Sequence, residues 1–325
     1  MTILFSVFLL SLLIIVALAI VHTENLFVAV MLMTIFSLLM ASNFFILDAA
    51  DVALTEAAVG AGVTTVIFLG ALALTVKREK PSKTISWFPL LIALIGSALL
   101  IYSSFDQPLL GDAAAPIHQH VAPWYLEQTP ELVDIPNVVT AVLATFRGYD
   151  TLGEVFVVFT ACIGVLFILN VAPGTTRPPK KIKNIGLRHH LIPKVVGRLV
   201  FPFIILFALY VQFHGEYGPG GGFQAGAIFA TAFILHALLE GESAALLAMP
   251  RNALFAMAAS GAILYTMVGL AGIAMGGSFL DYSVLHSNPV AGQQIGIIII
   301  EAGVGITVSG ALLSIFHAFA AREPS

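Results

Sequence analysis

Residues 51–76, DVALTEAAVGAGVTTVIFLGALALTV, decide the fold. The stretch is long enough to cross a membrane, because a spanning helix needs roughly 20 apolar residues to cross about 30 Å of hydrocarbon. Glu56 lies near one end, and Gly60 and Gly62 follow it. A carboxyl inside a membrane is costly, so an intramembrane Glu indicates a functional site. The glycines allow a neighbouring helix to approach closely, or the helix itself to change its winding.

The rest of the chain shares this apolar character. Of its 325 residues, 59% are hydrophobic and 10% are charged, which is typical of a polytopic membrane protein and not of a soluble domain. Long apolar runs must be helical, because backbone exposed to lipid has to satisfy its own hydrogen bonds. The sequence therefore predicts an all-α integral membrane protein with about nine transmembrane helices. They are expected near residues 3–22, 25–47, 53–76, 84–105, 151–171, 195–214, 222–241, 253–275 and 290–317.

The basic residues predict how the chain crosses the membrane. If the N-terminus is outside, all but one of the 14 Lys and Arg residues fall in cytoplasmic segments, and only Arg147 lies outside. An excess of Lys and Arg in cytoplasmic loops is the general rule for membrane proteins. We therefore expect a multi-pass protein of the cytoplasmic membrane that is N-out and C-in.

Changes in composition divide the chain into four segments. Five prolines between residues 106 and 136 exclude a continuous helix through that outer loop, whereas residues 137–149 have apolar residues at helical spacing and are expected to lie along the outer interface. No internal repeat is visible, which disfavours an autonomous transporter. The predicted segments are 1–80, a three-helix unit with Glu56; 81–176, a two-span block with the long outer loop; 177–194, a basic cytoplasmic linker; and 195–325, a four-helix domain.

Glu301 is a second intramembrane carboxyl. It follows four isoleucines in the last predicted span, about 16 Å from the start of that helix at 1.5 Å per residue. At such a depth an ionised side chain costs roughly 2.5–3.5 kcal/mol, and a desolvated carboxyl can load and release a proton. We expect Glu56 and Glu301 to form part of a proton path. The alternatives are that Glu56 occupies the first turns of its helix, near the positive end of the dipole, and that Glu301 is protonated and hydrogen-bonds a neighbouring helix.

His236 and Glu240 extend the predicted path toward the cytoplasm. They are four residues apart and so share one face of the seventh span. A His beside a carboxylate can titrate near neutral pH, which suits proton exchange. The alternative is a polar helix end at the membrane interface.

Three further carboxyls fall at the outer boundary. Asp48 and Asp51 are expected mainly to cap a helix, with a supply of protons to the path as the alternative. Glu154 is expected to be a first-turn carboxylate of the fifth span, and Arg147 and Asp150 beside it can neutralise each other.

Residues 214–226, HGEYGPGGGFQAG, superficially resemble a phosphate cradle, but no Lys-Ser/Thr follows, so nucleotide binding is not expected. The glycines predict a tight turn between two spans, because Gly tolerates positive φ. His118 and His120 have no further ligands in view, and we expect no metal, no cofactor, no catalytic residue and no nucleic-acid partner. The positions of interest in the turn are His214, Gly215, Pro219, Gly220, Gly221, Gly222 and Phe223.

These motifs resemble one family of ion transporters. TEAAVGAGVTTVIFLGALAL resembles the C-terminal extension of the large A-type subunit of Mrp multisubunit Na⁺/H⁺ antiporters, a small subunit of membrane-bound hydrogenases and the J-type subunit of respiratory complex I. NVVTAVLATFRGYDTLGE is similar to the next part of that extension. HGEYGPGGGFQAG resembles the signature of the Mrp B-type subunit, HGHxxPGGGFxGG, so the resemblance covers nearly the whole chain.

Two residues depart from the signature, because Glu216 stands where the family usually has His and Ala225 where it has Gly. Glu216 puts a role for a second histidine in doubt. The arrangement is also unusual, since parts of an A-type subunit precede a B-type one. The resemblance implies that Glu56 lies on a helix that can take a π-bulge at Gly60 and Gly62 and gate a water wire. It also implies that the main antiporter-like channels lie on A- and D-type subunits, with C-, E-, F- and G-type subunits around them.

The sequence thus predicts a membrane subunit of an Mrp-type Na⁺/H⁺ (monovalent cation/proton) antiporter complex, which contributes to H⁺ translocation and to assembly and is surrounded by lipid. Na⁺ is one candidate for the exchanged cation, and the sequence does not decide which cation it is. The chain is not expected to be an enzyme. The alternatives are a membrane subunit of a redox-driven complex such as an energy-converting hydrogenase, a structural scaffold with inert carboxyls, and a standalone transporter.

Overall fold

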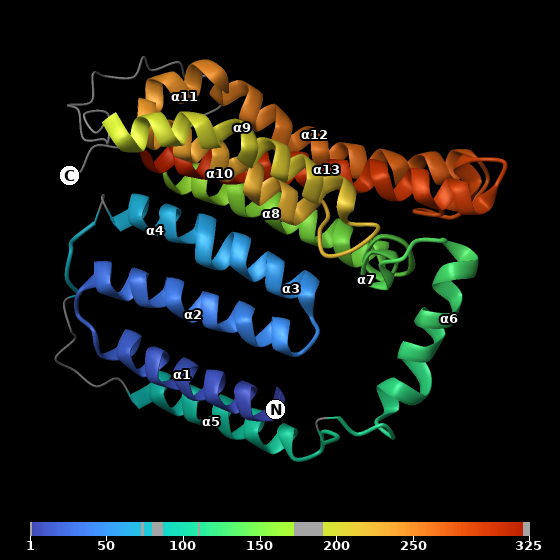
Figure 1. Ribbon diagram of the computed structural model, residues 1–325, viewed down its shortest axis with the longest axis horizontal. Helices are drawn as coiled ribbons and strands as arrows, with labels where there is room; N and C mark the ends of the chain where they lie inside the picture. The colour runs from blue at the N-terminus through green and yellow to red at the C-terminus, as the bar shows by residue number, and fades with distance from the viewer. Residues whose placement is uncertain (1, 73–74, 80–86, 110, 172–190, 321–325) are drawn as a thin grey trace.

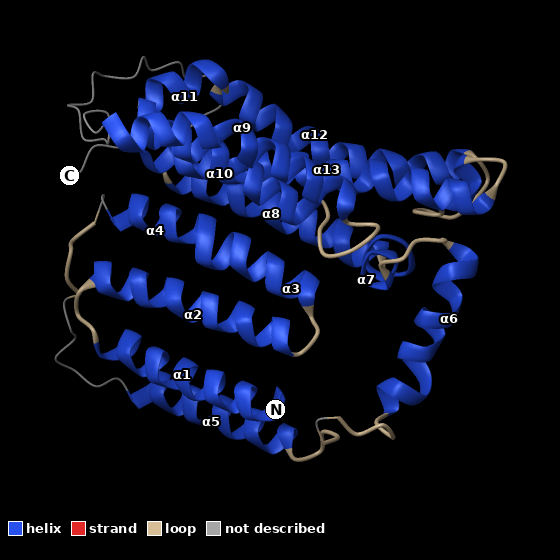
Figure 2. Ribbon diagram, viewed as in Figure 1, coloured by secondary structure: helices blue, strands red, loops and turns tan. Residues whose placement is uncertain are grey.

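The computed structural model describes residues 2–72, 75–79, 87–109, 111–171 and 191–320. In this part of the chain the regular elements are helices (Figures 1 and 2), and nine of them are long and apolar enough to cross a membrane. The prediction of an all-α polytopic protein is therefore confirmed. The side of the membrane that each helix end faces stays a prediction.

The spanning helices follow the predicted ranges closely. The third span is one continuous helix in three parts, α3 (Ala50–Thr55), η1 (Glu56–Val63) and α4 (Thr64–Leu72), of which η1 is a π-helix. The others are α1 (Thr2–His22), α2 (Leu26–Ile46), α5 (Trp87–Ser104), α8 (Gly148–Ile168), α9 (Leu191–His214), α10 (Gly222–Glu240), α12 (Arg251–Ala274) and α13 (Pro289–Ala320). Shorter helices are η2 (Ile117–Val121), α6 (Ala122–Leu132), α7 (Val138–Ala141), η3 (Val142–Phe146), α11 (Glu242–Ala248) and η5 (Tyr282–Leu285).

The predicted linker at 177–194 differs from the structure at its end. Residues 191–194 already belong to α9, and residues 177–190 lie outside the described residues. Lys194 therefore projects from a helix. We call the bundle end that carries Lys194 and Arg251 the basic end, and the end that carries residues 215–221 the turn end.

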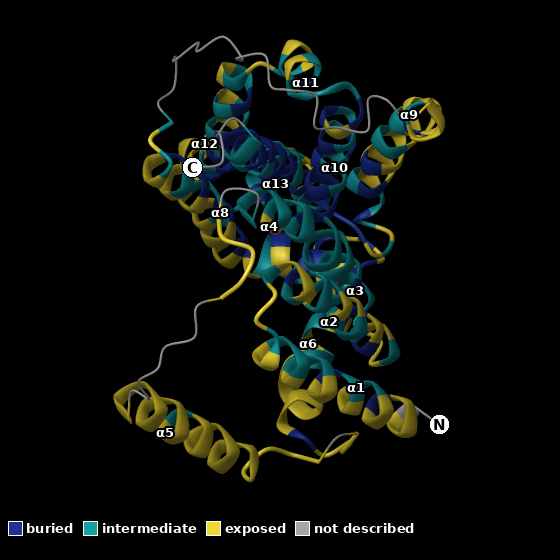
Figure 3. Cartoon of the chain, turned by 90° about the vertical axis from the view of Figure 1, so that its left-hand side faces the viewer, coloured by how far each residue is buried: buried dark blue, intermediate teal, exposed yellow. Residues whose placement is uncertain are grey.

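The core of the bundle is α13, which packs against α8, α10 and α12 (Figures 1 and 3). Within the most apolar 18-residue stretch of each span, 61% is buried in α13 and 56% is buried in α10. The helices meet through glycine. A Cβ on Gly222 would lie 2.1 Å from the backbone oxygen of Glu301, and a Cβ on Gly261 would lie 2.2 Å from that of Gly303. Close approach through small residues is the usual way in which membrane helices associate, because lipid already satisfies their apolar side chains.

The N-terminal helices form a layer beside this core. α1 packs on α2, α2 packs on the continuous helix α3–η1–α4, and that helix contacts α10 and α13. α5 stands apart from the bundle, and none of its residues is buried (Figure 3). Helices with so much exposed apolar surface are stable only against lipid or another apolar protein surface.

The outer loop contains a helix that the proline spacing did not predict. Residues 117–132 form η2 and α6. Pro123 is tolerated because it lies in the first turn of α6, where its missing N–H has no helical partner, and Pro130 lies near the end of the same helix. The prediction that no continuous helix runs through the loop is confirmed, because residues 111–115 and 133–137 on either side of this helix are not helical. The segment at 137–149 is helical as predicted, and it divides into α7, η3 and the start of α8.

Candidate functional site

Glu301 lies where α13 crosses the first turn of α10. The backbone N–H of Gly222 donates a hydrogen bond to Glu301 Oε2. The preceding residue, Gly221, provides no side-chain cap for α10, and its φ of 120° is one that favours glycine. A Cβ on Gly221 would lie 2.9 Å from Glu301 Oε2. The carboxyl of Glu301 therefore takes the place of a helix cap, where the dipole of α10 favours negative charge.

A cavity of about 60 Å³ opens beside Glu301. One water needs roughly 10–15 Å³ of such space, so the cavity has room for several. Glu216 also lines it, and Glu216 Oε1 is buried without a hydrogen-bond partner among the described residues. The lining residues are Thr140, Gln212, Phe213, Gly215, Glu216, Ile297, Ile298 and Glu301.

Other carboxyls, on separate segments, lie within electrostatic range of Glu301. Asp51, Glu154 and Glu216 lie close enough to interact with it electrostatically. Glu154 is exposed in the second turn of α8 and not in the first turn as predicted, because α8 already begins at Gly148. Carboxyls that interact in this way can share and pass protons.

Asp51 does not cap a helix, and this prediction was wrong. Ala49 holds the cap position of α3 without a side-chain hydrogen bond. Asp51 Oδ1 instead accepts hydrogen bonds from Gly220 N–H and Asn137 Nδ2, each at 3.3 Å. Asp48 also fails as a cap, since it is exposed in the turn before α3 with a φ of 59°. Asp51 thus joins the N-terminal layer to the turn end of the core.

The turn at 215–221 is held by α7. Asn137 Nδ2 lies 3.0 Å from the carbonyl oxygens of Gly215 and Gly218, and Thr140 Oγ1 donates to Gly215 O at 2.6 Å. His214 stacks on Tyr210 with ring centroids 4.8 Å apart. Pro219 and Phe223 flank the glycines of the turn, and Phe223 packs against the core. The sequence reasoning missed Asn137 and Thr140, although both are polar residues in a mostly apolar segment.

Glu56 is the first residue of the π-helix η1, which also contains Gly60 and Gly62. Its neighbour Thr55 accepts a hydrogen bond from Gln224 Nε2 at 2.7 Å, so η1 is tied to the first turn of α10 beside Glu301. A Cβ on Gly60 would lie 2.5 Å from Glu56 Oε1 and 2.8 Å from the Ser37 hydroxyl. The Glu56 carboxyl therefore lies over the bare backbone of Gly60.

The two glycines of η1 are expected to respond differently to alanine. Gly60→Ala would push the flexible Glu56 side chain aside, whereas the nearest atom to a Cβ on Gly62 is 3.5 Å away, an ordinary contact. We expect Gly60→Ala to assemble normally and to slow ion exchange about tenfold, and Gly62→Ala to match the wild type. Initial rates in vesicles that contain the complete complex measure this. Equal rates for the two variants would contradict a role for the Glu56 position.

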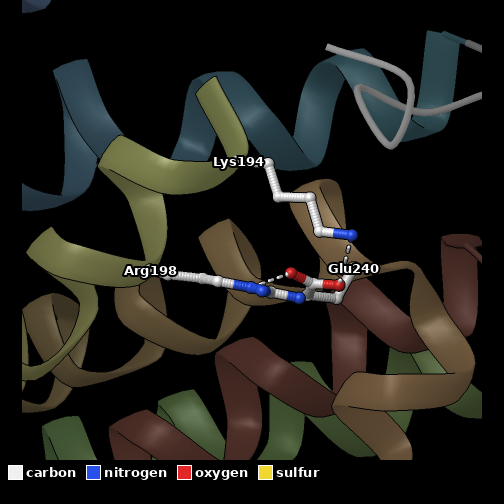
Figure 4. A network of polar contacts seen from close by, with 3 residues as sticks. All are labelled: Lys194, Arg198 and Glu240. Carbon is white, nitrogen blue, oxygen red and sulfur yellow. Dashed lines mark hydrogen bonds and ion pairs between the residues drawn. The ribbon is translucent and has the colours of Figure 1, made fainter. Parts of the chain in front are cut away.

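At the basic end, Glu240 pairs with α9 (Figure 4). Arg198 Nε lies 2.6 Å and Lys194 Nζ 3.3 Å from its carboxylate oxygens. His236 packs against the ring of Phe201, with centroids 5.4 Å apart. Lys194 and Arg198 are thus ion-pair partners of Glu240. From the sequence, these two basic residues had served only to predict the orientation of the chain in the membrane.

The half-buried carboxyl of Glu216 should make the stability of the folded chain depend on pH. Burial raises the pKa of the Glu216 carboxyl above its ordinary value of 4.5, so the folded chain holds this proton more tightly than the unfolded chain. The resulting stabilisation is complete below pH 4.5 and is lost as the pH rises through the folded-state pKa. We expect the thermal unfolding temperature of the purified chain in detergent to fall across this window.

Glu216→Gln is expected to remove this part of the pH dependence, because the amide does not ionise. Glu131→Gln, which changes an exposed carboxyl of α6, is the matched control and should retain it. If the unfolding temperatures of Glu216→Gln and the wild type depend on pH in the same way, the Glu216 carboxyl is exposed to solvent and the prediction fails.

These features define a polytopic helical membrane protein that carries an acidic side chain at a glycine-lined helix crossing. No group of three or more His, Cys, Asp or Glu that could hold a metal ion occurs within the described residues.

Three families match successive parts of the chain. Residues 192–314 match a domain related to the MnhB subunit of Na⁺/H⁺ antiporters, residues 11–77 match the D-type subunit of MBH, and residues 90–181 match the E-type subunit of MBH. A putative antiporter subunit mnhB2 of Staphylococcus haemolyticus (strain JCSC1435) is 31% identical over 39% of this chain and 92% of its own length. The chain therefore belongs to the family of MnhB-related antiporter subunits.

Longer relatives and solved structures cover more of the chain. A probable A/B-type subunit of a K⁺/H⁺ antiporter from Rhizobium meliloti (strain 1021) is 28% identical over 61% of this chain, which spans 22% of that relative's length. The Mrp complex from Dietzia sp. DQ12-45-1b shares the fold, with a TM-score of 0.75 and 24% identity over 96% of this chain and 34% of that one. An archaeal membrane-bound sulfane sulfur reductase matches with a TM-score of 0.53 and 30% identity over 73% of this chain and 98% of that one.

Proposed function

We propose that this chain is a membrane subunit of a multisubunit monovalent cation/proton antiporter complex in the cytoplasmic membrane, and that it carries part of the proton path. The relatives named as Na⁺/H⁺ and K⁺/H⁺ antiporter subunits support the class. The observation that carries the proposal is Glu301, a carboxyl at mid-helix that borders a cavity large enough for water together with the carboxyl of Glu216.

A proton path requires groups that change protonation and a connection between them. Water in the cavity would join Glu216 to Glu301 at the turn end. Gln224, Thr55 and the π-helix η1 lead from there to Glu56. A π-helix has a weaker and wider hydrogen-bond pattern than an α-helix, and such segments are frequent at functional sites. His236 and Glu240 remain candidates at the basic end.

Further subunits complete the complex in this proposal. The exposed apolar surface of α1 and α5 needs lipid or protein partners, and A-, D-, C-, E-, F- and G-type subunits are the partners that the Mrp resemblance implies. The cation is Na⁺ or K⁺, and it crosses through other chains, because carboxyls spread over different helices suit proton transfer better than a cation cage.

The test uses the complete complex, co-expressed with its neighbouring subunits and placed in vesicles that report internal pH. Adding Na⁺ or K⁺ outside is expected to move protons in the opposite direction without any electron donor. If neither cation exchanges for protons, the proposal fails.

A second candidate is a membrane subunit of a redox-driven ion pump. It is favoured by the matches to the D- and E-type subunits of MBH and to the sulfane sulfur reductase. In that case the purified complex would contain redox subunits and would move ions only when an electron donor is supplied.

A further inference from the structure

A buried polar cluster lies at the basic end, between α11, α12 and α13. Glu242 is the first residue of α11, Arg251 the first residue of α12, and His317 lies in the last turn of α13. Arg251 Nη2 lies 3.3 Å from Glu242 Oε1, and His317 Nδ1 lies 4.0 Å from the same oxygen. The His317 side chain is only 2% exposed. The cluster therefore places an imidazole beside a carboxylate inside the protein.

A cavity of about 10 Å³ adjoins this cluster. Its polar lining comes from Arg251, Ser314 and His317, and the remaining side chains are apolar. His317 Nδ1 and Ser314 Oγ are both buried without a hydrogen-bond partner among the described residues. An unpaired buried polar atom costs about 1–3 kcal/mol, so such atoms in native proteins usually contact ordered water. One water needs about 10–15 Å³ and two to four polar partners, and this cavity supplies both.

We propose that the cluster binds one water molecule and that His317 exchanges protons with the basic end of the membrane through that water. This inference rests on the proposed function, for which it supplies a group that loads protons at the basic end. A proton from solvent passes to the water, and the water passes a proton to Nδ1, which gives an imidazolium beside Glu242. Loss of that proton restores the neutral imidazole and the same water.

The charges around His317 suit a group that changes protonation. Glu242 of α11 favours the imidazolium, whereas Arg251 of α12 and the burial of the side chain oppose it. From α8, the Cys162 thiol lies beside Ser314. His236, by contrast, is partly exposed and packs on Phe201.

Polar side chains continue along α13 from His317 toward the level of Glu301. Thr307, Ser314 and His317 are spaced by seven and three residues, which places them on one side of the helix. Thr307 Oγ1 is also buried without a partner among the described residues. A protonatable group at His317 would lie about 24 Å along the helix axis from Glu301, so the two groups would act at well-separated levels of one helix.

The experiment compares His317→Gln, Glu242→Gln and His118→Gln in vesicles that contain the complete complex, across a series of pH values. Size-exclusion chromatography confirms that each variant assembles. We expect His317→Gln to slow exchange about tenfold. Glu242→Gln should shift the pH profile of the rate to lower pH, because the imidazolium loses its counter-charge, while His118→Gln, which changes an exposed His of η2, should follow the wild type. A high-resolution structure of the wild-type complex should show density for water between His317 Nδ1, Ser314 Oγ and Arg251.

Two results would overturn the inference. One is a cavity without water density, which can be judged even if the variants do not assemble. The other is an unchanged rate and pH profile in assembled His317→Gln. Both differ from a failure of the proposed function, in which the wild-type complex itself would exchange no protons for Na⁺ or K⁺.

Discussion

Glu301→Gln is expected to reduce cation-driven proton exchange by the complete complex at least about 100-fold, because the amide cannot take up or release a proton. The substitution is nearly isosteric. Its carbonyl oxygen can still accept the hydrogen bond that Gly222 N–H gives to Glu301 Oε2, so the cap of α10 and the packing of α13 should persist. The rate is measured from internal pH in vesicles after a Na⁺ or K⁺ step, with equal amounts of assembled complex.

This variant separates two roles for the carboxyl. If Glu301 only joins α13 to α10, the Gln variant should assemble and exchange ions at the wild-type rate. Glu301→Ala adds a second comparison, since it removes the hydrogen bond as well and should also lower assembly or thermal stability. Glu131→Gln on the exposed face of α6 is the control for loss of a carboxyl. Wild-type exchange by Glu301→Gln would remove this residue from the proton path.

Gly222→Ala is expected to destabilise the core by about 1–3 kcal/mol or more and to lower the yield of assembled complex. A Cβ at this position would lie 2.1 Å from the backbone oxygen of Glu301 and 2.9 Å from Gly305 N. Backbone atoms cannot move aside as a flexible side chain can, so α10 and α13 would have to separate. That shift would also break the hydrogen bond between Gly222 N–H and Glu301.

Gly164→Ala provides the matched control. Gly164 lies inside α8, and nothing lies within 4 Å of a Cβ built there. Alanine is the better helix former by roughly 0.5–1 kcal/mol, so this variant should be as stable as the wild type or more stable. Thermal unfolding of the purified chain in detergent and the yield of complex report the difference. Equal unfolding temperatures for the two variants would show that the α10–α13 contact is looser than described.

Much of the fold could be predicted from local sequence. Each spanning helix is an apolar run that would have to form its own backbone hydrogen bonds in lipid, whatever its neighbours are. Glu56 and Glu301 stood out for the same reason, since a carboxyl in such a run is costly wherever the helix packs. The proline-rich loop was less predictable, because the effect of a proline depends on its place in a helical turn, as Pro123 illustrates.

The partners of those carboxyls could not be predicted. Gly220 and Asp51 are 169 residues apart, as are Gln224 and Thr55, yet both pairs are hydrogen-bonded. Nothing in the spacing of Asp51 distinguishes a helix cap from a link to a distant turn. His317 was overlooked because a single His near a helix end carries no signal until Glu242 and Arg251 are placed beside it.

The sequence by itself determined that this chain is a helical membrane protein and which of its helices bear buried charge, because both follow from the cost of placing each residue in hydrocarbon. Only the tertiary structure decided that Glu301 meets the first turn of α10 beside a cavity, that Asp51 and Glu216 lie near it, and that His317 adjoins a second cavity. Those features depend on how closely helices approach, and glycine–backbone contacts between segments distant in sequence set that distance.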